Sequence, residues 1–388
     1  MRVVVVGGGV MGSSFAWWLN GDPAFTGEIL VVERDSGYRR ASSALSASSV
    51  RQQFSTPVNI AIGRFGFDFL RRAEDLLAVG GERPAIGLVE RGYLMLAGAE
   101  GAPILRANHA LQRECGVEVA LLDPDALRAR FPWLATEGLA LGSLGLAGEG
   151  WFDGWGLLQA FRRAARARGA RYLEAEVVAG ERRGRRALAV RLASGERLAA
   201  DVLVVAAGPW AARVAAMFEL ALPVEARRRS VYMFETPEPP AEAPLVVDPS
   251  GVWFRPEGRG FICGAPPPEE EDLPDLPLVA EDGFFEERIW PALAERIPAF
   301  ERLRLRSSWA GYYAYNRFDQ NALLGAHPEV DNLFFMAGFS GHGIQQAPAV
   351  GRGIAELVLH GAYRSLDLSP LDIGRLAAGR PLRERAVI

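Results

Sequence analysis

The stretch VVVVGGGVMG at residues 3–12 decides the fold of this chain. Its first part, Val3 to Val6, is a run of β-branched residues that predicts a buried parallel strand. Glycines then follow at the spacing G-x-G-x-x-G, namely Gly7, Gly9 and Gly12. This spacing supplies a tight turn, close approach of the backbone to a pyrophosphate, and close packing of a helix on a strand. We therefore predict a dinucleotide-binding turn, with Val10 and Met11 opening a helix that extends to about residue 20.

An acidic residue follows the second predicted strand. That strand, residues 29–32, is apolar and ends at Glu33. A carboxylate at this distance from the glycines binds a ribose 2′-hydroxyl, whereas an NADP site tends to place an arginine there. Arg34 is adjacent, so the adenosine 2′-phosphate alternative is weakened but stays open. Strand, glycines, helix, strand and acid in this order predict a dinucleotide site, and the motif alone does not choose between NAD and FAD.

Composition excludes several classes of function. The 388 residues are enough for two or three domains, and the formal net charge of -4 with 23% charged residues indicates neither a nucleic-acid partner nor a disordered chain. All of the Lys+Arg residues are arginines, because the sequence contains no lysine. Lysine Schiff-base chemistry and pyridoxal-phosphate anchoring are therefore excluded.

The cysteines and the apolar runs indicate whether the protein has disulfides, a metal site or a membrane span. Cys115 and Cys263 are the only cysteines, and the 4 histidines form no ligand pattern with them, so we expect neither a disulfide framework nor a metal site. Because a strand is predicted from residue 3, we expect no signal peptide, and no apolar run reaches the roughly 18 residues of a transmembrane span. We expect a cytoplasmic protein without a transmembrane span.

Two more stretches rich in small residues follow predicted strands. The strand at 201–206 leads into Ala206-Ala207-Gly208-Pro209-Trp210, and the strand at 333–336 leads into AGFSGHGI at 337–344 and a helix from about residue 348. Open α/β sheets receive ligands at such strand ends. The serine-rich stretch at 39–56 has two interpretations, a flexible linker or a buried extended loop that lies against a bulky ligand.

Five motifs carry a resemblance to a known family. They are VVVVGGGVMG at 3–12, ASSALSASSVRQQFS at 41–55, VVAAGPWA at 204–211, WAGYYAYNRFDQNALLG at 309–325 and AGFSGHGIQQAPAVGR at 337–352. In this order they resemble the D-amino-acid oxidase-like (DAO) FAD-dependent oxidoreductases of the glutathione-reductase-type-2 class, such as glycine oxidase, sarcosine oxidase and dimethylglycine dehydrogenase. The second, fourth and fifth motifs are most similar to the mitochondrial FAD-dependent oxidoreductase domain-containing group and to the β subunits of sarcosine and proline dehydrogenases.

The resemblance implies FAD, bound non-covalently in an extended form. The implied contacts of the ADP half are Gly7, Gly9, Val10, Met11, Gly12, Glu33, Arg34 and Val177. The implied contacts of the pyrophosphate, ribityl chain and flavin are Ser42, Ser43, Ala47, Ser48, Arg51, Gln52, Ala206, Ala207, Gly208, Trp210, Gly311, Gly338, Phe339, Ser340, Gly341, His342, Gly343 and Ile344. Leu45 stands where dimethylglycine dehydrogenase carries its flavin on a histidine, which argues against that covalent link.

The implied reaction is oxidation of a secondary or tertiary amine or an amino acid similar to sarcosine, dimethylglycine, proline or glycine. Hydride passes to flavin N5, and water hydrolyses the resulting imine. An arginine fork suits a substrate carboxylate, so Arg51 and Arg255 are the first candidates and Arg317 is the next. The other expected catalytic-site residues are Trp253, Tyr313 and His342, with further pocket aromatics at Tyr232, Phe254, Tyr312 and Tyr315. The alternatives are a surface charge for Arg255 and a structural role for His342.

The electron acceptor is a separate question. Oxidases of the monomeric sarcosine type use a lysine above the flavin, in the strand that resembles GFICG at 260–264, and this chain has no lysine. We therefore expect a dehydrogenase that passes electrons to an acceptor subunit or a quinone. Glycine oxidase manages without such a lysine, so an oxygen-using amino-acid oxidase remains an alternative, as do a non-catalytic flavin-binding assembly factor and an NAD(P)-linked enzyme.

The expected fold is α/β, with a Rossmann-like FAD-binding domain and a substrate domain whose sheet is mainly antiparallel and flanked by helices. We predict that the FAD-binding domain is discontinuous, formed by 1–85, 146–220 and 305–388, and that the substrate domain is formed by 86–145 and 221–304.

Overall fold

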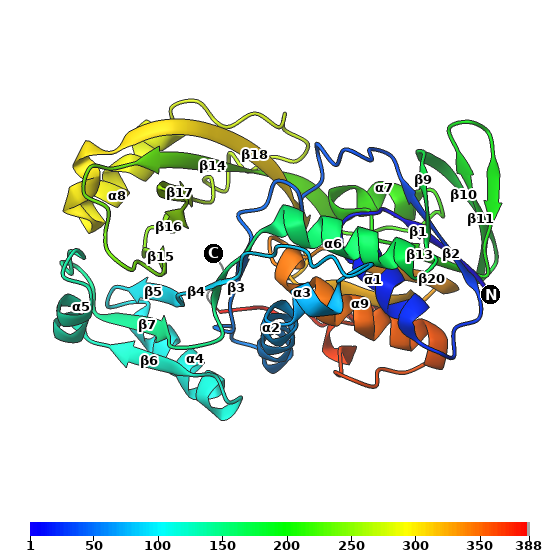
Figure 1. Cartoon of the computed structure of the whole chain (residues 1–388), viewed down its shortest axis with the longest axis horizontal. Helices are drawn as coiled ribbons and strands as arrows, with labels where there is room; N and C mark the ends of the chain where they lie inside the picture. Colours follow the sequence, from blue (N-terminus) through cyan, green and yellow to red (C-terminus); the bar gives the residue numbers. More distant parts are fainter. Residues whose placement is uncertain (386–388) are drawn as a thin grey trace.

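The computed structural model describes residues 1–385 and shows two lobes, each built on a large sheet (Figure 1). The first lobe holds a six-stranded sheet in the order β19-β20-β13-β1-β2-β9. Its strands are β1 (Arg2–Val6), β2 (Glu28–Glu33), β9 (Arg171–Glu174), β13 (Val202–Val205), β19 (Leu323–His327) and β20 (Val330–Ala337). All of its pairings are parallel except that of β19 with β20.

Strand β1 is buried on both faces, as its β-branched sequence predicts. Val3 and Val5 pack with helices on one face, and Val4 and Val6 belong to the core on the other. The helices on the first face are α1 (Val10–Gly21), α6 (Gly154–Ala167) and α9 (Gly343–His360). The second face is covered by a three-stranded sheet of β10 (Val177–Arg183), β11 (Arg186–Leu192) and β12 (Arg197–Ala199), and by α7 (Ala211–Ala216).

The parallel register brings three loops to one edge of this sheet. Val5 pairs with Val204, and Val204 pairs with Phe334, so β1, β13 and β20 end side by side. The three stretches of small residues after these strands therefore meet at their carboxyl ends. This confirms that the chain returns to the first sheet after long excursions.

The second lobe holds an eight-stranded sheet in the order β18-β14-β17-β16-β15-β5-β7-β6. Its strands are β5 (Tyr93–Ala97), β6 (Val119–Leu122), β7 (Leu141–Gly145), β14 (Val224–Glu235), β15 (Leu245–Val247), β16 (Trp253–Glu257), β17 (Gly260–Gly264) and β18 (Arg304–Asn316). Helices α4 (Ala102–Glu114), α5 (Pro124–Arg130) and α8 (Trp290–Arg296) flank it. Only β15 with β5 is a parallel pair among these strands, which confirms a mainly antiparallel sheet.

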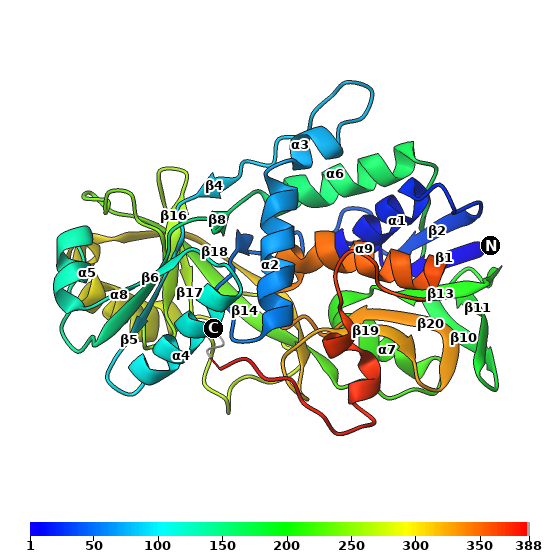
Figure 2. The same cartoon turned by 90° about the horizontal axis from the view of Figure 1, so that it is seen from below.

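Two long strands and one helix connect the lobes. Strands β14 and β18 run from the second lobe towards the first (Figure 1). There the backbone amide of Asn316 donates to the Ser340 hydroxyl at 2.9 Å. Helix α2 (Pro57–Leu70) lies between the lobes and packs on α9 (Figure 2). The remaining elements are α3 (Ala73–Leu76), β3 (Ser49–Val50), β4 (Val89–Glu90), β8 (Gly150–Trp151), the 3-10 helices η1 (Gly208–Trp210), η3 (Pro298–Arg302), η4 (Ser369–Leu371) and η5 (Ile373–Arg375), and the π-helix η2 (Phe285–Ile289).

Two details differ from expectation. Helix α9 begins at Gly343, not near Pro348, which lies inside it, so the helix N-terminus is next to the glycine loop. Strand β18 pairs within the second sheet although the predicted division assigned it to the FAD-binding segments. The domain boundaries themselves stay a prediction.

Candidate active site

One cavity of about 740 Å³ lies where the carboxyl edge of the six-stranded sheet meets β14 and β18. This volume is in the upper part of the range for small-molecule and cofactor sites. The predicted residues that line it are Gly7, Gly9, Val10, Met11, Glu33, Arg34, Ser42, Ser43, Ala47, Ser48, Arg51, Val177, Ala206, Ala207, Gly208, Trp210, Trp253, Gly311, Tyr312, Tyr313, Tyr315, Phe339, Ser340, Gly341, His342, Gly343 and Ile344. The structure thus brings together the three loops and the serine-rich stretch.

The dinucleotide turn depends on glycine at two positions. Gly7 has φ +107°, and a Cβ there would lie 2.4 Å from the Ala206 carbonyl oxygen. A Cβ on Gly12 would lie 2.0 Å from the Gly7 carbonyl oxygen. Gly9 is different, because its added Cβ would meet only the Ser43 hydroxyl, at 3.5 Å. Gly7 and Gly12 therefore allow the chain to pack, while Gly9 leaves space on the cavity side.

Helix α1 offers free amides to this space. Its first helical bond runs from the Ser13 amide to the Gly9 carbonyl at 3.0 Å, so the amides of Val10, Met11 and Gly12 come before the first amide that donates within the helix. The Glu33 carboxylate stands beside the turn and accepts from the Gly8 amide at 2.8 Å. A turn without side chains, open amides and an acid beside them fit a dinucleotide pyrophosphate and ribose.

A cationic and aromatic group walls the end of the cavity next to Glu33. The Arg34 guanidinium lies 3.7 Å from the centre of the Trp210 ring, and Arg40 lies 5.5 Å from the same ring. Burial, and then the charge of Arg40, lowers the pKa of Arg34 from its ordinary value. Arg40 also lines the cavity and was missed from the sequence. A stacked arginine of this kind provides a flat surface for a nucleotide base.

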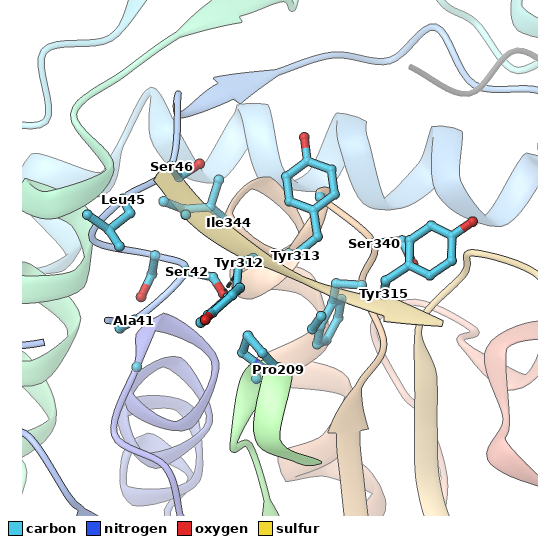
Figure 3. A pocket seen from close by; sticks show the side chains of 18 of the residues that line it. Ala41, Ser42, Leu45, Ser46, Pro209, Tyr312, Tyr313, Tyr315, Ser340 and Ile344 are labelled. Carbon is cyan, nitrogen blue, oxygen red and sulfur yellow. Dashed lines mark hydrogen bonds between the residues drawn. The ribbon is translucent and has the colours of Figure 1, made fainter. Parts of the chain in front are cut away.

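The serine-rich stretch is an extended loop fixed by hydrogen bonds, as in the second of its two interpretations, and not a flexible linker. The Ser42 hydroxyl donates to the Tyr312 carbonyl at 2.5 Å (Figure 3). The Trp309 indole donates to the Leu45 carbonyl at 3.0 Å. Arg255 donates to the Ala47 carbonyl through Nη2 at 2.6 Å and through Nε at 3.2 Å. Its small residues let the backbone lie along the cavity instead of forming a linker.

Arg51 is the basic residue at the junction of this loop with α9. Its amide donates to the Gln345 side chain at 2.8 Å, and its Nη2 lies 3.1 Å from His342 Nε2. Burial, and then the charge of Arg51, lowers the pKa of His342 to about 3. The imidazole is therefore neutral near pH 7, and Nε2 accepts from the guanidinium. The guanidinium also lies 4.4 Å from the Phe54 ring.

A buried carboxylate supports the loop from below. Glu149 is 0% exposed and accepts from the amides of Gln52 at 2.7 Å and Gln53 at 3.0 Å. It also accepts from the Gln53 side chain at 2.9 Å and from the Tyr93 amide at 3.2 Å. Burial raises the pKa of Glu149. The sequence carries no motif around Glu149 that would have identified this role.

Strands β14 and β18 supply the other wall. Side chains alternate along β18, so Tyr312 points towards Pro209 and Tyr313 points to the opposite side (Figure 3). Burial raises the pKa of Tyr313. Arg229 on β14 lies 5.1 Å from the Tyr313 ring and lines the cavity together with Tyr93 and Asp272, all missed from the sequence. Arg229 is the last of three consecutive arginines in β14, and alternation along a strand turns neighbouring side chains to opposite faces.

Seven predicted residues do not line the cavity, namely Gly12, Gln52, Gly338, Arg255, Arg317, Tyr232 and Phe254. Phe254 is buried in the core of the second lobe, the Tyr232 hydroxyl donates to the Glu281 carbonyl at 2.8 Å, and Arg317 pairs with Glu225 at 2.7 Å. Gly12 lies under the turn, the Gln52 side chain donates to the Gly148 carbonyl at 3.1 Å, and Gly338, with φ +70°, packs on Asn316. Arg255 is 4% exposed, and its guanidinium bonds the Ala47 and Pro256 carbonyls and pairs with Glu257. This correction gives Arg255 a role in holding the loop, because its donors point at backbone.

The described part of the chain lacks two features that would indicate other functions. Residues 1–385 contain no group of three or more His, Cys, Asp or Glu that could hold a metal ion. None of the helices in that range combines the length and apolar character needed to cross a membrane.

Known proteins with similar chains agree with this geometry. The model of a family described as FAD dependent oxidoreductase (DAO) matches residues 2–357. FAD-dependent oxidoreductase domain-containing protein 1 of Bos taurus is 43% identical, covering 100% of this chain and 87% of the bovine protein. Glycine oxidase of Geobacillus kaustophilus is 28% identical, covering 96% of each chain. The crystal structure of L-proline dehydrogenase from P. horikoshii matches with a TM-score of 0.85 and 25% identity over 98% of this chain and 99% of that one.

The family match includes the glycine turn, the strands of the second lobe and most of α9. FAD is the cofactor of this family and is a dinucleotide of the kind that the turn fits. The bovine relative extends the similarity to the whole chain. The chain therefore belongs to the FAD-dependent oxidoreductase family, the DAO family.

Proposed function

We propose that this protein oxidises a secondary or tertiary amine or an amino acid, of the sarcosine, dimethylglycine, proline or glycine type. One observation carries the proposal: a single cavity joins the dinucleotide turn to a region lined by Arg51, Tyr313, Trp253 and a neutral His342. The names of the relatives, glycine oxidase and L-proline dehydrogenase, describe reactions of this kind in those proteins.

Bound FAD would supply the hydride acceptor, while the chain positions and shields the substrate. We assign the three predicted glycine regions and the 42–48 loop to holding FAD. We expect no covalent bond, because Leu45 stands in this loop where dimethylglycine dehydrogenase carries its flavin on a histidine. Arg51 offers five N–H donors, of which Nη1 bonds the Gln53 carbonyl at 3.3 Å and Nη2 meets His342. Its other donors are available to an anionic group on the substrate or on FAD, and His342 fixes their direction.

The neutral state of His342 matters for this assignment. A protonated imidazole would face the Arg51 guanidinium at 3.1 Å, so the pair is stable only with the proton absent. His342 then acts as a positioning residue for Arg51. The aromatic side chains of Tyr93, Trp253 and Tyr313 would exclude water from the amine and keep it unprotonated during hydride loss.

We also propose that electrons leave to an acceptor subunit or a quinone. The absence of lysine from the whole sequence supports this, since a lysine is the group that activates oxygen in monomeric sarcosine-type oxidases.

The test is an anaerobic titration of the FAD-loaded protein with sarcosine, dimethylglycine, proline, glycine and D-amino acids, followed at the visible flavin band. Bleaching by one compound is the expected result, and reoxidation by an electron-accepting dye but not by air is expected for a dehydrogenase. A loaded protein that none of these compounds bleaches would argue for the non-catalytic assembly role. Rapid hydrogen peroxide formation in air would argue for an oxidase.

A further inference from the structure

The segment at 265–282 forms part of the cavity wall. It follows β17, is acidic and rich in proline, and contributes Ala265, Pro266, Pro267, Glu269 and Asp272 to the cavity lining. Strand β17 pairs with β14 only at residues 232–234, so the start of β14 has a free edge beside this segment.

The far part of the segment is fastened to that edge. The Asp275 amide donates to the Ala226 carbonyl at 2.8 Å, and the Tyr312 hydroxyl donates to the Leu276 carbonyl at 2.5 Å. The Glu281 amide donates to the Ser230 hydroxyl at 3.1 Å. The nearer part, 265–273, carries no regular strand or helix, and in it Asp272 reaches a side chain of β14.

That side chain is Arg229. Its Nη1 and Nη2 donate to the two carboxylate oxygens of Asp272 at 2.7 and 2.9 Å, with side-chain exposures of only 14% and 15%. Two parallel N–H···O bonds to one carboxylate are the arrangement that arginine offers to any carboxylate. Both residues line the cavity, and Arg229 lies over the Tyr313 ring, which is next to Gly341 of the third glycine loop.

We propose that Arg229 binds the carboxylate of the substrate, and that Asp272 is an internal carboxylate that occupies this fork until the substrate displaces it. The inference rests on the proposed function and narrows it: the substrate is an amino acid, not a simple amine. Arg255 cannot take this role because its donors are bound to backbone carbonyls and Glu257. Arg51 keeps donors for an anionic group, but both of its terminal nitrogens already bond protein atoms, the Gln53 carbonyl and His342, so it lacks the two-nitrogen fork that Arg229 offers.

The Asp272 carboxylate and the substrate carboxylate compete for the Arg229 guanidinium. While Asp272 holds Arg229, an incoming carboxylate gains only the difference between two similar charge-assisted pairs. Removing the charge of Asp272 leaves the guanidinium without an anionic partner, so an external carboxylate should then bind more tightly. A ligand with an amine but no carboxylate should be unaffected by the change.

The experiment uses the FAD-loaded full chain and propionate as the probe, with propylamine as the matched ligand without a carboxylate. Dissociation constants come from perturbation of the visible flavin band. We expect Asp272→Asn to tighten propionate binding roughly tenfold, and Arg229→Gln to weaken it by roughly tenfold or more, as expected for hydrogen bonds to charged groups. Propylamine binding should be equal in all variants.

Asp275→Asn is the control variant. Asp275 lies in the same segment and pairs with Arg213 at 2.9 Å, but both side chains are largely exposed. Its propionate affinity should match that of the wild type. Unchanged propionate binding in both Asp272→Asn and Arg229→Gln would overturn the proposal, and the Asp272 variant gives an answer even if the Arg229 variant folds poorly.

The two proposals can fail separately. Propionate binding requires no turnover, so the Arg229 dependence can hold even if none of the amines bleaches the flavin. Conversely, bleaching by amines with and without a carboxylate at equal affinity would support amine oxidation and overturn the role of Arg229.

Discussion

The two ends of the cavity are built by different means. At the dinucleotide end, backbone atoms do most of the work: Gly7 and Gly12 make room for other main chain, and the amides of α1 are left open. At the other end, side chains from distant segments converge, with Arg51 beside β3 and Arg229 on β14. The first end depends on the absence of side chains, and the second on the position of a few charged ones. Substitutions of Gly7 and Gly12 should therefore affect folding, and substitutions of Arg51 and Arg229 should affect chemistry.

Gly12→Ala should have the largest effect. The added methyl would lie 2.0 Å from a backbone oxygen, so the turn must deform, at a cost of about 3 kcal/mol or more. We expect little folded, FAD-containing protein, measured by thermal unfolding and by the ratio of flavin to protein absorbance.

Gly9→Ala is the matched change at the same turn. Its methyl makes an ordinary contact at 3.5 Å, so the unfolding temperature of the apoprotein should be close to that of the wild type while FAD affinity falls. Equal apoprotein stability for Gly12→Ala and the wild type would show that the turn is not limited by packing.

The two buried arginines test the second end. Arg51→Gln should lower kcat/KM by roughly a hundredfold, about 2.7 kcal/mol, because Arg51 lines the cavity. Arg255→Gln leaves the Ala47 carbonyl without its donor and should lower the free energy of unfolding by about 2 kcal/mol. The flavin-loaded fraction of the Arg255 variant should keep a nearly normal kcat/KM in a dye-reduction assay. A large loss of kcat/KM in that fraction would show that Arg255 acts in catalysis and not only in holding the loop.

The smallest effect concerns pH. The pKa of His342 is lowered to about 3, whereas a histidine in the unfolded chain titrates near 6.5. Between these values only the unfolded chain takes up this proton, so the stability that the neutral imidazole contributes is present above pH 6.5 and is lost as the pH falls. The expected loss between pH 7.5 and 5.5 is about 1.4 kcal/mol.

His342→Gln should remove this part of the acid sensitivity, because glutamine keeps an acceptor for Arg51 and does not titrate. Unfolding free energies of the apoprotein at the two pH values give the comparison. His109→Gln is the control, because His109 lies on α4 outside the cavity lining, with Nε2 3.3 Å from the Val119 carbonyl. Parallel loss of stability in the wild type and His342→Gln would contradict a lowered pKa.

The sequence predicted the first end well and the second only in part. The spacing of the glycines and the position of Glu33 are local, so they specify the turn without knowledge of the fold. Arg229, Asp272 and Glu149 become neighbours of the site only through the pairing of β14 with β18 and the return of the 265–282 segment. Arg255 shows the reverse: its residue type suited a carboxylate, but the direction of its donors depends on where Ala47 lies.

The cavity wall joins residues 7, 42, 206, 311 and 344, which no short stretch of chain connects. A ligand that touches all of them closes long loops of the chain, so the loaded form gains stability with the concentration of free FAD. At one hundred times the dissociation constant this gain is about 2.7 kcal/mol. The steady-state abundance of the protein in a cell should then follow the supply of flavin, since empty chains unfold more often and are degraded first.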